Sequence, residues 1–368
     1  MSKLRVAVIG SGMIANVAHI PGYLRLPEMY EIAAVSDLLE DVAKHTSEMH
    51  KIPQYFKDPQ KMLDEVKPDI VSICTPNMYH KEWTIKALNS GANVICEKPI
   101  AMKLSDAKEM YATAEKNNKF FTVVQTMRFG QDVVKKYLDQ KVLGEIYAIH
   151  VESVRRRGVP NWGMFHMKEH NGGGPFCDMG VHLLDQIIWL LGNPKITTVS
   201  GSAYAKIANQ EEDVAVFPTD NGAPGGLFTP RTYDYRENNV EDSSFAFIRL
   251  ENGITITMRV TWAINLPPNN FVSYAGTKGG LITNPFKIYT NIDGYQTEYT
   301  PQTKPVRPVK TEGEGIPFYS HTKLFRHVYD VMFNGAELFI KKEEVLNVMA
   351  GIEAFYESAR TGQEVRIK

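Results

Sequence analysis

A short apolar run near the start of the chain, Leu4–Ile9, leads directly into Gly10-Ser11-Gly12-Met13-Ile14-Ala15. In this GxGxxA spacing the first glycine permits a tight turn, the second lets backbone approach a pyrophosphate, and the alanine lets a helix lie close to a sheet. The free N–H groups and positive dipole end of that helix favour a phosphate. The pattern predicts a strand–turn–helix unit that binds a dinucleotide through Gly10, Gly12, Met13 and Ile14.

The first third of the chain repeats this alternation of strand and helix. Further short apolar runs rich in β-branched residues occur at Glu31–Ser36, Ile70–Cys74, Asn93–Cys96 and Phe121–Val124. Segments with helical spacing lie between them at Pro59–Val66, His80–Ser90 and Ser105–Asn118, the last expected to be capped by Ser105. Continuous apolar strands that alternate with helices are typical of a parallel sheet covered on both faces. We therefore expect an α/β Rossmann domain over residues 1–124.

The pattern changes after about residue 125, and 368 residues exceed one ordinary domain. Strands are expected at Gly144–Val154, Thr197–Tyr204, Ser243–Leu250, Ile254–Trp262 and Phe271–Ala275, with a hairpin at Asn252-Gly253. Helices are expected at Val181–Leu191 and over 346–359, and long loops at Gln210–Glu237 and Tyr289–Gly315. Residues 125–368 are thus predicted to form an α+β substrate-binding and oligomerisation domain with a mostly antiparallel open sheet.

Composition excludes several classes of function. The 41 Lys and Arg residues balance 42 Asp and Glu residues, so no electrostatic argument favours nucleic acid or a membrane surface. No apolar run is long enough to cross a bilayer, and the N-terminus lacks the pattern of a secretory signal. The three cysteines, Cys74, Cys96 and Cys177, form no CxxC pair. We expect reduced buried thiols, no metal site and a cytoplasmic protein.

The second predicted strand ends at Ser36-Asp37. A carboxylate at that place accepts hydrogen bonds from the adenosine ribose hydroxyls and repels a 2′-phosphate. Leu38 and Leu39 follow, and the next basic residue is Lys44. Asp37 therefore favours NAD over NADP as the cofactor.

Three further motifs make the prediction more specific. They are Cys74-Thr75-Pro76-Asn77-Met78-Tyr79-His80, Cys96-Glu97-Lys98-Pro99, and the segment from Gly172-Gly173-Gly174 through Asp178 and His182 to Asp185. Together with GxGxxA they resemble the glucose–fructose oxidoreductase and inositol dehydrogenase (Gfo/Idh/MocA-type) family. The resemblance implies that Lys98, Asp178 and His182 form the catalytic group. It also implies that a set of residues after the strands lines the cofactor: Thr75, Pro76, Asn77, His80, Glu97 and Lys98.

The residues of the catalytic group also suit this chemistry on physical grounds. A partly buried Lys98 at the end of a strand is expected to have a lowered pKa and to polarise a substrate oxygen. Asp178 and His182 are four apart, so a helix places them one turn apart on one face. Histidine is well suited to take a proton near neutral pH. We expect all three side chains to contact the substrate, and the preceding glycines to permit close approach of a ligand or of the other domain.

Other candidates leave more than one role open. Arg128, after the last Rossmann strand, either contacts the cofactor or seals the junction between the domains. Trp162 is expected to wall a sugar pocket, since aromatic faces stack on sugars. Phe165, His166 and His170 are weaker candidates for the same wall, and His321 could approach the cleft. Asp185 is consistent with a structural role, and the run Arg155-Arg156-Arg157 with a solvated surface.

These residues favour an NAD-dependent dehydrogenase that oxidises a secondary hydroxyl of a sugar, inositol or related carbohydrate by hydride transfer. Two alternatives stay open: an NAD-assisted glycosidase or sugar–sugar oxidoreductase that retains its cofactor, and a dinucleotide-binding regulator without catalysis. An apolar sheet face without helices of its own predicts a homodimer or homotetramer. The sequence leaves the substrate and the direction of reaction undetermined.

Overall fold

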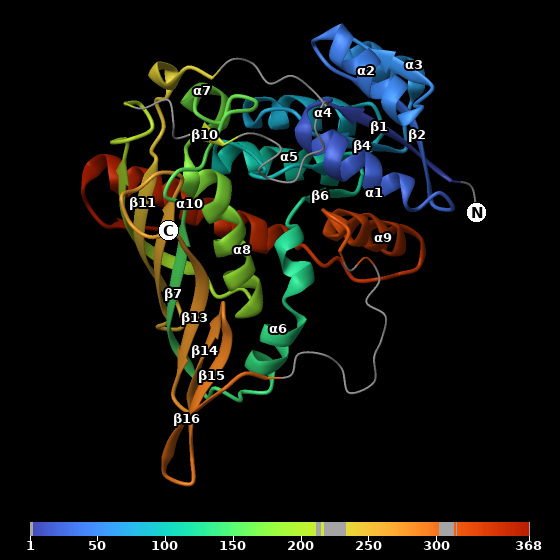
Figure 1. Cartoon of the computed structure of the whole chain (residues 1–368). Helices are drawn as coiled ribbons and strands as arrows, with labels where there is room; N and C mark the ends of the chain where they lie inside the picture. Colours follow the sequence, from blue (N-terminus) through green and yellow to red (C-terminus); the bar gives the residue numbers. More distant parts are fainter. Residues whose placement is uncertain (1–2, 211–214, 217–232, 302–312, 314, 368) are drawn as a thin grey trace.

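The computed structural model describes residues 3–210, 215–216, 233–301, 313 and 315–367. The N-terminal part is a six-stranded parallel sheet in the order β3-β2-β1-β4-β5-β6, seen edge-on among its helices in Figure 1. Its strands are β1 (Leu4–Ile9), β2 (Tyr30–Ser36), β3 (Gln54–Phe56), β4 (Ile70–Ile73), β5 (Asn93–Cys96) and β6 (Phe121–Val123). The strand order reverses between β1 and β4, and ligands of such sheets bind at the carboxyl ends beside that reversal.

Helices cover both faces of this sheet and confirm the predicted alternation. They are η1 (Ala15–His19) with α1 (Ile20–Leu24), α2 (Glu40–His50), α3 (Pro59–Val66), α4 (His80–Asn89) and α5 (Leu104–Lys116). The expected cap at Ser105 is wrong, because α5 begins one residue earlier and Lys103 is its N-cap, with no side-chain cap bond. Leu104 packs against the core from the first position of the helix, which explains the earlier start.

The second sheet has nine strands in the order β16-β15-β14-β13-β7-β12-β11-β9-β17. They are β7 (Ile146–Val154), β9 (Ile196–Tyr204), β11 (Ser243–Leu250), β12 (Thr255–Thr261), β13 (Asn269–Gly276), β14 (Gly279–Thr283), β15 (Phe286–Ile292), β16 (Tyr295–Tyr299) and β17 (Val365–Arg366). All pairs are antiparallel except β12 with β7. The Asn252-Gly253 hairpin is confirmed as the link between β11 and β12.

The loop expected at Tyr289–Gly315 is wrong in its first part, where β15 and β16 form a hairpin. Its turn is Asp293-Gly294, and both residues have positive φ, 51° and 84°. This dipeptide is a strong signal for a tight hairpin that the sequence reading missed. Residues 302–312 and 314, and most of the loop expected at Gln210–Glu237, lie outside the described residues.

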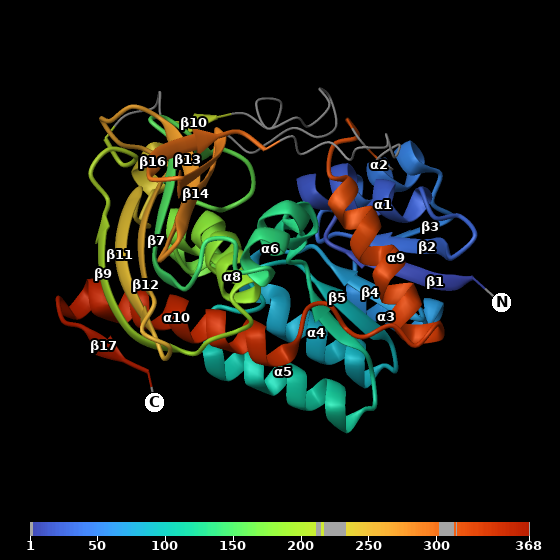
Figure 2. The same ribbon diagram turned by 90° about the horizontal axis from the view of Figure 1, so that it is seen from below.

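The remaining helices divide between the two domains. They are α6 (Asp132–Asp139), α7 (Lys168–Asn171), η4 (Phe176–Gly180) with α8 (Val181–Leu190), α9 (Tyr319–Phe333) and α10 (Lys342–Thr361). Figure 2 shows α8 beside the face of the large sheet that is turned toward the N-terminal domain. Helix α9 instead packs on the Rossmann domain, where the Phe325 ring stacks on Tyr23 with 3.9 Å between centroids. The division at residue 124 remains a prediction, and α9 returns across it.

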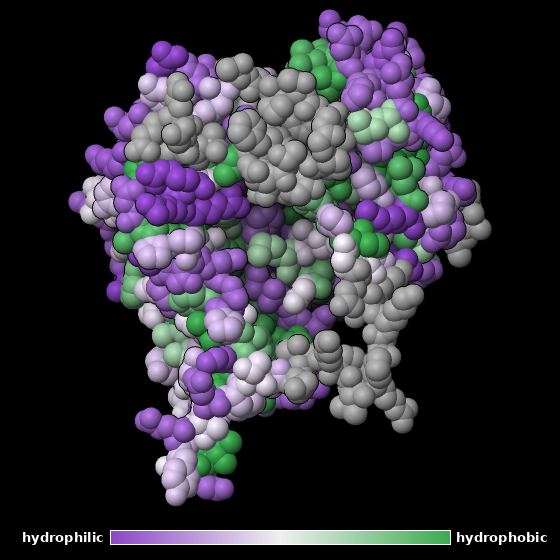
Figure 3. All heavy atoms as spheres, in the orientation of Figure 1, coloured by the Kyte–Doolittle hydropathy of each residue, from purple (hydrophilic) through white to green (hydrophobic). Residues whose placement is uncertain are grey.

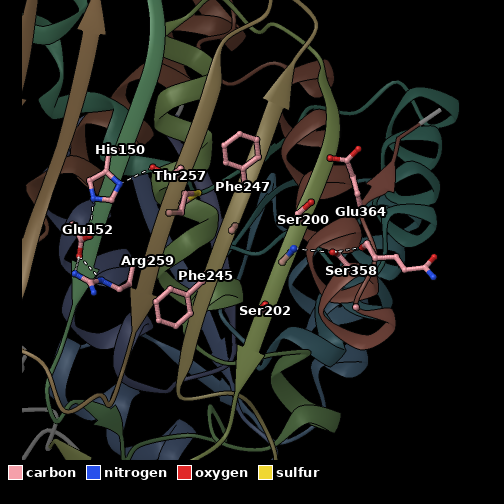
Figure 4. A pocket seen from close by; sticks show the side chains of 15 residues that line it. His150, Glu152, Ser200, Ser202, Phe245, Phe247, Thr257, Arg259, Ser358 and Glu364 are labelled. Carbon is pink, nitrogen blue, oxygen red and sulfur yellow. Dashed lines mark hydrogen bonds and ion pairs between the residues drawn. The ribbon is translucent and has the colours of Figure 1, made fainter.

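The other face of the large sheet carries a hollow of about 590 Å³. This face of the sheet was predicted to be apolar, but it carries both apolar and polar side chains. Figure 4 shows Phe245 and Phe247 next to a polar group in which Glu152 binds both His150, at 2.8 Å, and Arg259, at 2.7 Å. Alternation along β7 and β12 puts these polar residues on the face opposite the helices.

The sequence predicted that no segment crosses a membrane and that the three cysteines are reduced and buried. None of their helices combines the length and apolar character that a membrane span requires. Cys74, Cys96 and Cys177 are free and buried, as predicted.

Candidate active site

Gly10 and Gly12 of the first turn are glycines for different physical reasons. A Cβ on Gly10 would lie 2.6 Å from the carbonyl oxygen of Cys74, and its φ is +91°, so the protein's own packing requires glycine there. A Cβ on Gly12 would meet nothing within 4 Å. The space beside Gly12 is therefore open to a ligand, at the start of the helix that follows β1. This cradle fits the pyrophosphate of a dinucleotide.

Replacing Gly12 with Ala is expected to weaken NAD binding by at least about tenfold, because the added methyl enters the space next to the phosphates. The midpoint of thermal unfolding without cofactor should stay unchanged, since the methyl contacts no protein atom. Gly10→Ala is the matched control, and it should lower the unfolding midpoint directly. Calorimetric titration and thermal unfolding of both variants check this; unchanged NAD affinity in Gly12→Ala would refute the assignment.

Asp37 lies at the carboxyl end of β2 and is held by backbone. Its Oδ2 accepts the N–H of Ser11 at 3.0 Å, and its Oδ1 accepts the N–H of Leu39 at 2.9 Å. The bond to Ser11 ties the carboxylate to the glycine turn. Leu38 and Leu39 are 61% and 67% exposed, an unusual degree for leucine, and they provide apolar surface beside the carboxylate. A carboxylate with adjacent apolar surface suits an adenosine.

Lys98 and Asp178 form an ion pair between the domains. The Lys98 Nζ donates to Asp178 Oδ1 at 2.7 Å and to the Asp178 carbonyl at 3.1 Å. Both side chains are largely buried, at 16% and 13% exposure. Burial acts to lower the pKa of Lys98, but the Asp178 carboxylate outweighs it and raises that pKa above its ordinary value. The expected lowered pKa is therefore wrong, and Lys98 is a fixed ammonium rather than a proton donor near neutral pH.

Asp178 has a second partner that the sequence reading missed. The indole N–H of Trp262 donates to Asp178 Oδ2 at 3.3 Å, and Trp262 is fully buried directly after β12. Both carboxylate oxygens are thus engaged, and the carboxylate is fixed in orientation. The sequence signal was a tryptophan at the end of a strand, but only the packing of β12 against η4 in the folded protein brings it to Asp178.

His182 lies one turn after Asp178 on the same helix, as predicted. The segment Phe176–Gly180 is a π-helical turn, a feature frequent at functional sites. Burial, and next the Lys98 ammonium, lowers the pKa of His182 to about 3. Its ring is therefore neutral near pH 7, and Nδ1 is buried without a hydrogen-bond partner. A neutral imidazole next to a fixed ammonium can accept a proton from a group that the ammonium polarises.

The glycines before Asp178 approach protein rather than a ligand. A Cβ on Gly173 would lie 2.0 Å from the Tyr356 hydroxyl, and one on Gly174 would lie 2.0 Å from the Glu241 carbonyl oxygen. Both partners belong to the second domain, so the expectation of approach to a ligand or the other domain is wrong for these two. Gly172, with φ +86°, does face Met102 of the first domain. These contacts fix the start of the helix that carries Asp178 and His182.

Glu97 connects Lys98 to two histidines behind the site. Glu97 Oε2 accepts the Lys98 backbone N–H at 3.1 Å, while Oε1 lies 2.9 Å from His19 Nε2 and 3.5 Å from His321 Nε2. Burial acts to raise the pKa of Glu97, but the histidines hold it well below its usual range. The three ligand atoms lie within 4.8 Å of one another and could hold a metal ion. Glu97 is hydrogen-bonded both to His19 Nε2 and to the Lys98 backbone, so we interpret the cluster as a brace for Lys98.

The surface is hollowed between the two domains near α8, as Figure 3 shows. Comparison with known proteins identifies the fold that produces this site. Residues 4–125 match the family model described as "Oxidoreductase family, NAD-binding Rossmann fold", and residues 135–367 match "Oxidoreductase family, C-terminal alpha/beta domain". The chain belongs to this oxidoreductase family. It is the glucose–fructose oxidoreductase and inositol dehydrogenase family that the motifs predicted.

Relatives of the chain include enzymes named for sugars and polyols. The chain is 34% identical over 375 residues to D-glucoside 3-dehydrogenase of Escherichia coli, covering 100% of this chain and 98% of the relative. It is 22% identical over 382 residues to scyllo-inositol 2-dehydrogenase (NADP(+)) of Bacillus subtilis, covering 100% and 97%. A solved levoglucosan dehydrogenase in complex with NADH and levoglucosan has the same fold, with a TM-score of 0.79 at 19% identity and full coverage of both chains.

The family's threonine–proline–asparagine motif lies at the edge of the site. Thr75 has a buried Oγ1 without a partner, Pro76 is exposed, and Asn77 donates to the carbonyl and side-chain oxygens of Asn171 at 2.8 and 2.7 Å. The Thr75 hydroxyl is therefore buried with its hydrogen-bonding capacity unused, and Asn77 connects the domains. His80 was predicted to line the cofactor, but it is fully buried, with its ring nitrogens 2.8 and 2.9 Å from the Pro99 and Thr75 carbonyls. It fixes the two loops from behind.

Arg128 was placed among the cofactor-binding residues, and the structure corrects this. Its side chain is fully buried and forms two parallel bonds to Asp185, at 2.7 and 2.6 Å, and one of 2.5 Å to Glu344. Each guanidinium nitrogen donates a hydrogen bond to Asp185 on α8 or to Glu344 on α10, so none is free for a ligand. Arg128 seals the domain junction, the other role considered, and Asp185 is structural.

Trp162 lies in the loop before α7 and is 8% exposed. Its ring packs edge-on against Phe165, with 6.1 Å between centroids. No contact ties either ring to Lys98 or Asp178, so the sugar-wall role of Trp162 remains a prediction. His166 is fully buried, and His170 is half-buried.

Proposed function

We propose that this chain is an NAD-dependent dehydrogenase that oxidises a secondary hydroxyl of a sugar. The observation that carries the proposal is the fixed Lys98 ammonium, held by Asp178, next to the neutral His182. The full-length similarity to a D-glucoside 3-dehydrogenase at 34% identity supports a glucoside and its C3 hydroxyl. Relatives that act on inositol support the wider class of polyols.

The residues present fit a dinucleotide. The open cradle at Gly12, the unpartnered Thr75 hydroxyl and the Asp37 carboxylate lie at the carboxyl ends of β1, β4 and β2. Asp37 supports NAD over NADP, because a 2′-phosphate would meet its negative charge. Met13 and Ile14, at the start of the helix, would line the cofactor site.

The chemistry follows from the protonation states of the site. NAD, when bound, supplies the hydride acceptor. His182 accepts the proton of the substrate hydroxyl, because its ring is neutral near pH 7 and its Nδ1 has no hydrogen-bond partner among the described residues. The Lys98 ammonium donates a hydrogen bond to the substrate oxygen as negative charge develops there, an electrostatic stabilisation in a largely buried site. Asp178 holds the ammonium in place, and Trp262 holds Asp178.

The deciding experiment follows NADH absorbance with purified protein, NAD and a panel of glucosides, inositols and anhydrosugars. Accumulation of NADH with a glucoside is the expected result. Cleavage of a glycoside without net NADH would support the glycosidase with retained cofactor instead. NAD binding without turnover of any sugar would support the non-enzymatic regulator.

We further propose that the open face of the large sheet mediates a homodimer or homotetramer. The support is a broad strand surface that no helix of the described residues covers, and on which Phe245 is 36% exposed. Sedimentation should give a mass of at least two chains, and Phe245→Glu should lower it. A monomer at micromolar concentration would refute this proposal.

A further inference from the structure

Arg155 directly follows β7, in a charge run that sequence alone assigns to a solvated surface. Alternation along β7 decides which way its side chain points. Ile149 and Val151 are 2% and 0% exposed and face α8, whereas His150 and Glu152 lie on the open face in Figure 4. Arg155 is an even number of positions from Ile149 and Val151. Its side chain therefore points to the same face of the sheet as theirs, which is the face that carries the active site.

The pairing of β7 with β12 places Arg155 beside the site. The two strands are parallel, and Val154 pairs with Thr261. Arg155 donates its backbone N–H to the Thr261 carbonyl at 3.2 Å and accepts the Thr261 hydroxyl at 3.0 Å. Trp262, the residue directly after that strand, binds Asp178. Arg155 and Trp262 are thus neighbours at one end of the same sheet face.

The charge environment agrees with this position. Burial acts to raise the pKa of Asp178, whereas Lys98 and then Arg155 act to lower it, and the pKa lies below its usual value. The guanidinium of Arg155 is consequently near enough to influence the carboxylate that holds Lys98, although it makes no ion pair with it.

Arg155 also lacks a carboxylate of its own. Ion pairs hold Arg128, Arg236, Arg249 and Arg259. Over the described residues, Arg155 has no such pair, and its side chain makes one hydrogen bond, to the Gly158 carbonyl at 3.3 Å. It is partly buried, so most of its five N–H donors are left at the edge of the site. A partly buried guanidinium with free donors is matched by a carboxylate or phosphate.

We propose that Arg155 is a specificity-determining residue that binds an anionic substituent of the substrate, so that the enzyme prefers anionic sugars over neutral ones. This inference rests on the proposed function, since it assigns a substrate class to the same site. The shared chemistry is an oxyanion that accepts two guanidinium N–H bonds. A carboxylate, as in a glucuronide, and a phosphate, as in a sugar phosphate, both offer it.

The test measures binding directly, by calorimetric titration of the NAD-loaded protein. Methyl β-glucoside is the neutral probe, and methyl β-glucuronide and glucose 6-phosphate are the two anionic probes. At least one anion should bind about tenfold or more tightly than the neutral glucoside, the scale of a charge-assisted hydrogen bond, and added salt should reduce the difference. The better anion identifies carboxylate or phosphate.

Two matched variants locate the effect. Arg155→Met should abolish the anion preference. Arg156→Met should keep it, because Arg156 is exposed and alternation points its side chain to the opposite face of the sheet. Equal or weaker binding of both anions to the unmodified protein would overturn the proposal, a comparison that needs no variant. A preference retained in Arg155→Met, or lost equally in Arg156→Met, would also overturn it.

The failure of this inference is distinguishable from failure of the proposed function. NADH formation from neutral glucosides without any anion preference leaves the dehydrogenase intact and removes the role of Arg155. An anion preference in binding without NADH formation from any sugar keeps the role of Arg155 and removes the dehydrogenase.

Discussion

His182→Ala is expected to lower kcat by about 10²–10⁴-fold, the usual contribution of a positioned general base. NAD affinity should change little, because the cofactor cradle is formed by the glycine turn and Asp37. His182 is only half-buried, so the unfolding midpoint should fall only slightly. Turnover is measured as NADH formation, and NAD binding by calorimetric titration.

The pH profile separates this role from a merely structural one. Because the pKa of His182 is about 3 in the free enzyme, kcat/KM should show no acid limb near the ordinary histidine pKa of about 6.5. Lys98 contributes to that low value, so Lys98→Met should raise the pKa of His182 and move the acid limb to higher pH. An acid limb near 6.5 in the unmodified enzyme that disappears in His182→Ala would contradict the low pKa. Unchanged turnover in His182→Ala would remove His182 as the base.

Features that depend on neighbouring residues could be predicted from the sequence. The glycine turn, the helix Pro59–Val66 and the Asn252-Gly253 hairpin each follow from steric rules that operate within a few positions. The Asp293-Gly294 hairpin follows the same rule, and it was missed because the surrounding segment is polar. The one-turn spacing of Asp178 and His182 was also predictable, since both lie on one helix.

Features that depend on distant partners could not be predicted in the same way. Lys98 was expected to have a lowered pKa because burial was the only effect visible locally, but Asp178, 80 positions away, reverses the direction. Trp262 reaches Asp178 across 84 positions because β12 packs against η4. The position of Arg155 beside Trp262 likewise requires the pairing of β12 with β7. Motifs located the site, whereas tertiary contacts determined its charges.

The largest effect on stability is expected for Arg128→Met. The substitution leaves the carboxylates of Asp185 and Glu344 at the domain junction without their cation, and their side chains are only 1% and 11% exposed. Removing one partner of a buried ion pair costs about 3–5 kcal/mol, because the remaining charge is neither solvated nor paired. The free energy of unfolding in urea should fall by that amount, and the ion pairs that join η3 (Thr126–Gly130) to α8 and α10 should be lost.

The matched control is Arg249→Met, which removes the same side chain from an exposed ion pair with Glu364. Solvent screens that pair, so the loss should be at most about 1 kcal/mol. The two variants should also differ in their pH dependence. Burial already raises the pKa of Asp185, and Arg128 opposes this; without Arg128 the folded-state pKa should rise further above its unfolded value. Protonation as the pH falls then relieves the buried charge, so the deficit of Arg128→Met should shrink toward acid pH, whereas that of Arg249→Met should stay small throughout. Equal losses in the two variants would show that the junction does not depend on the buried ion pairs of Arg128.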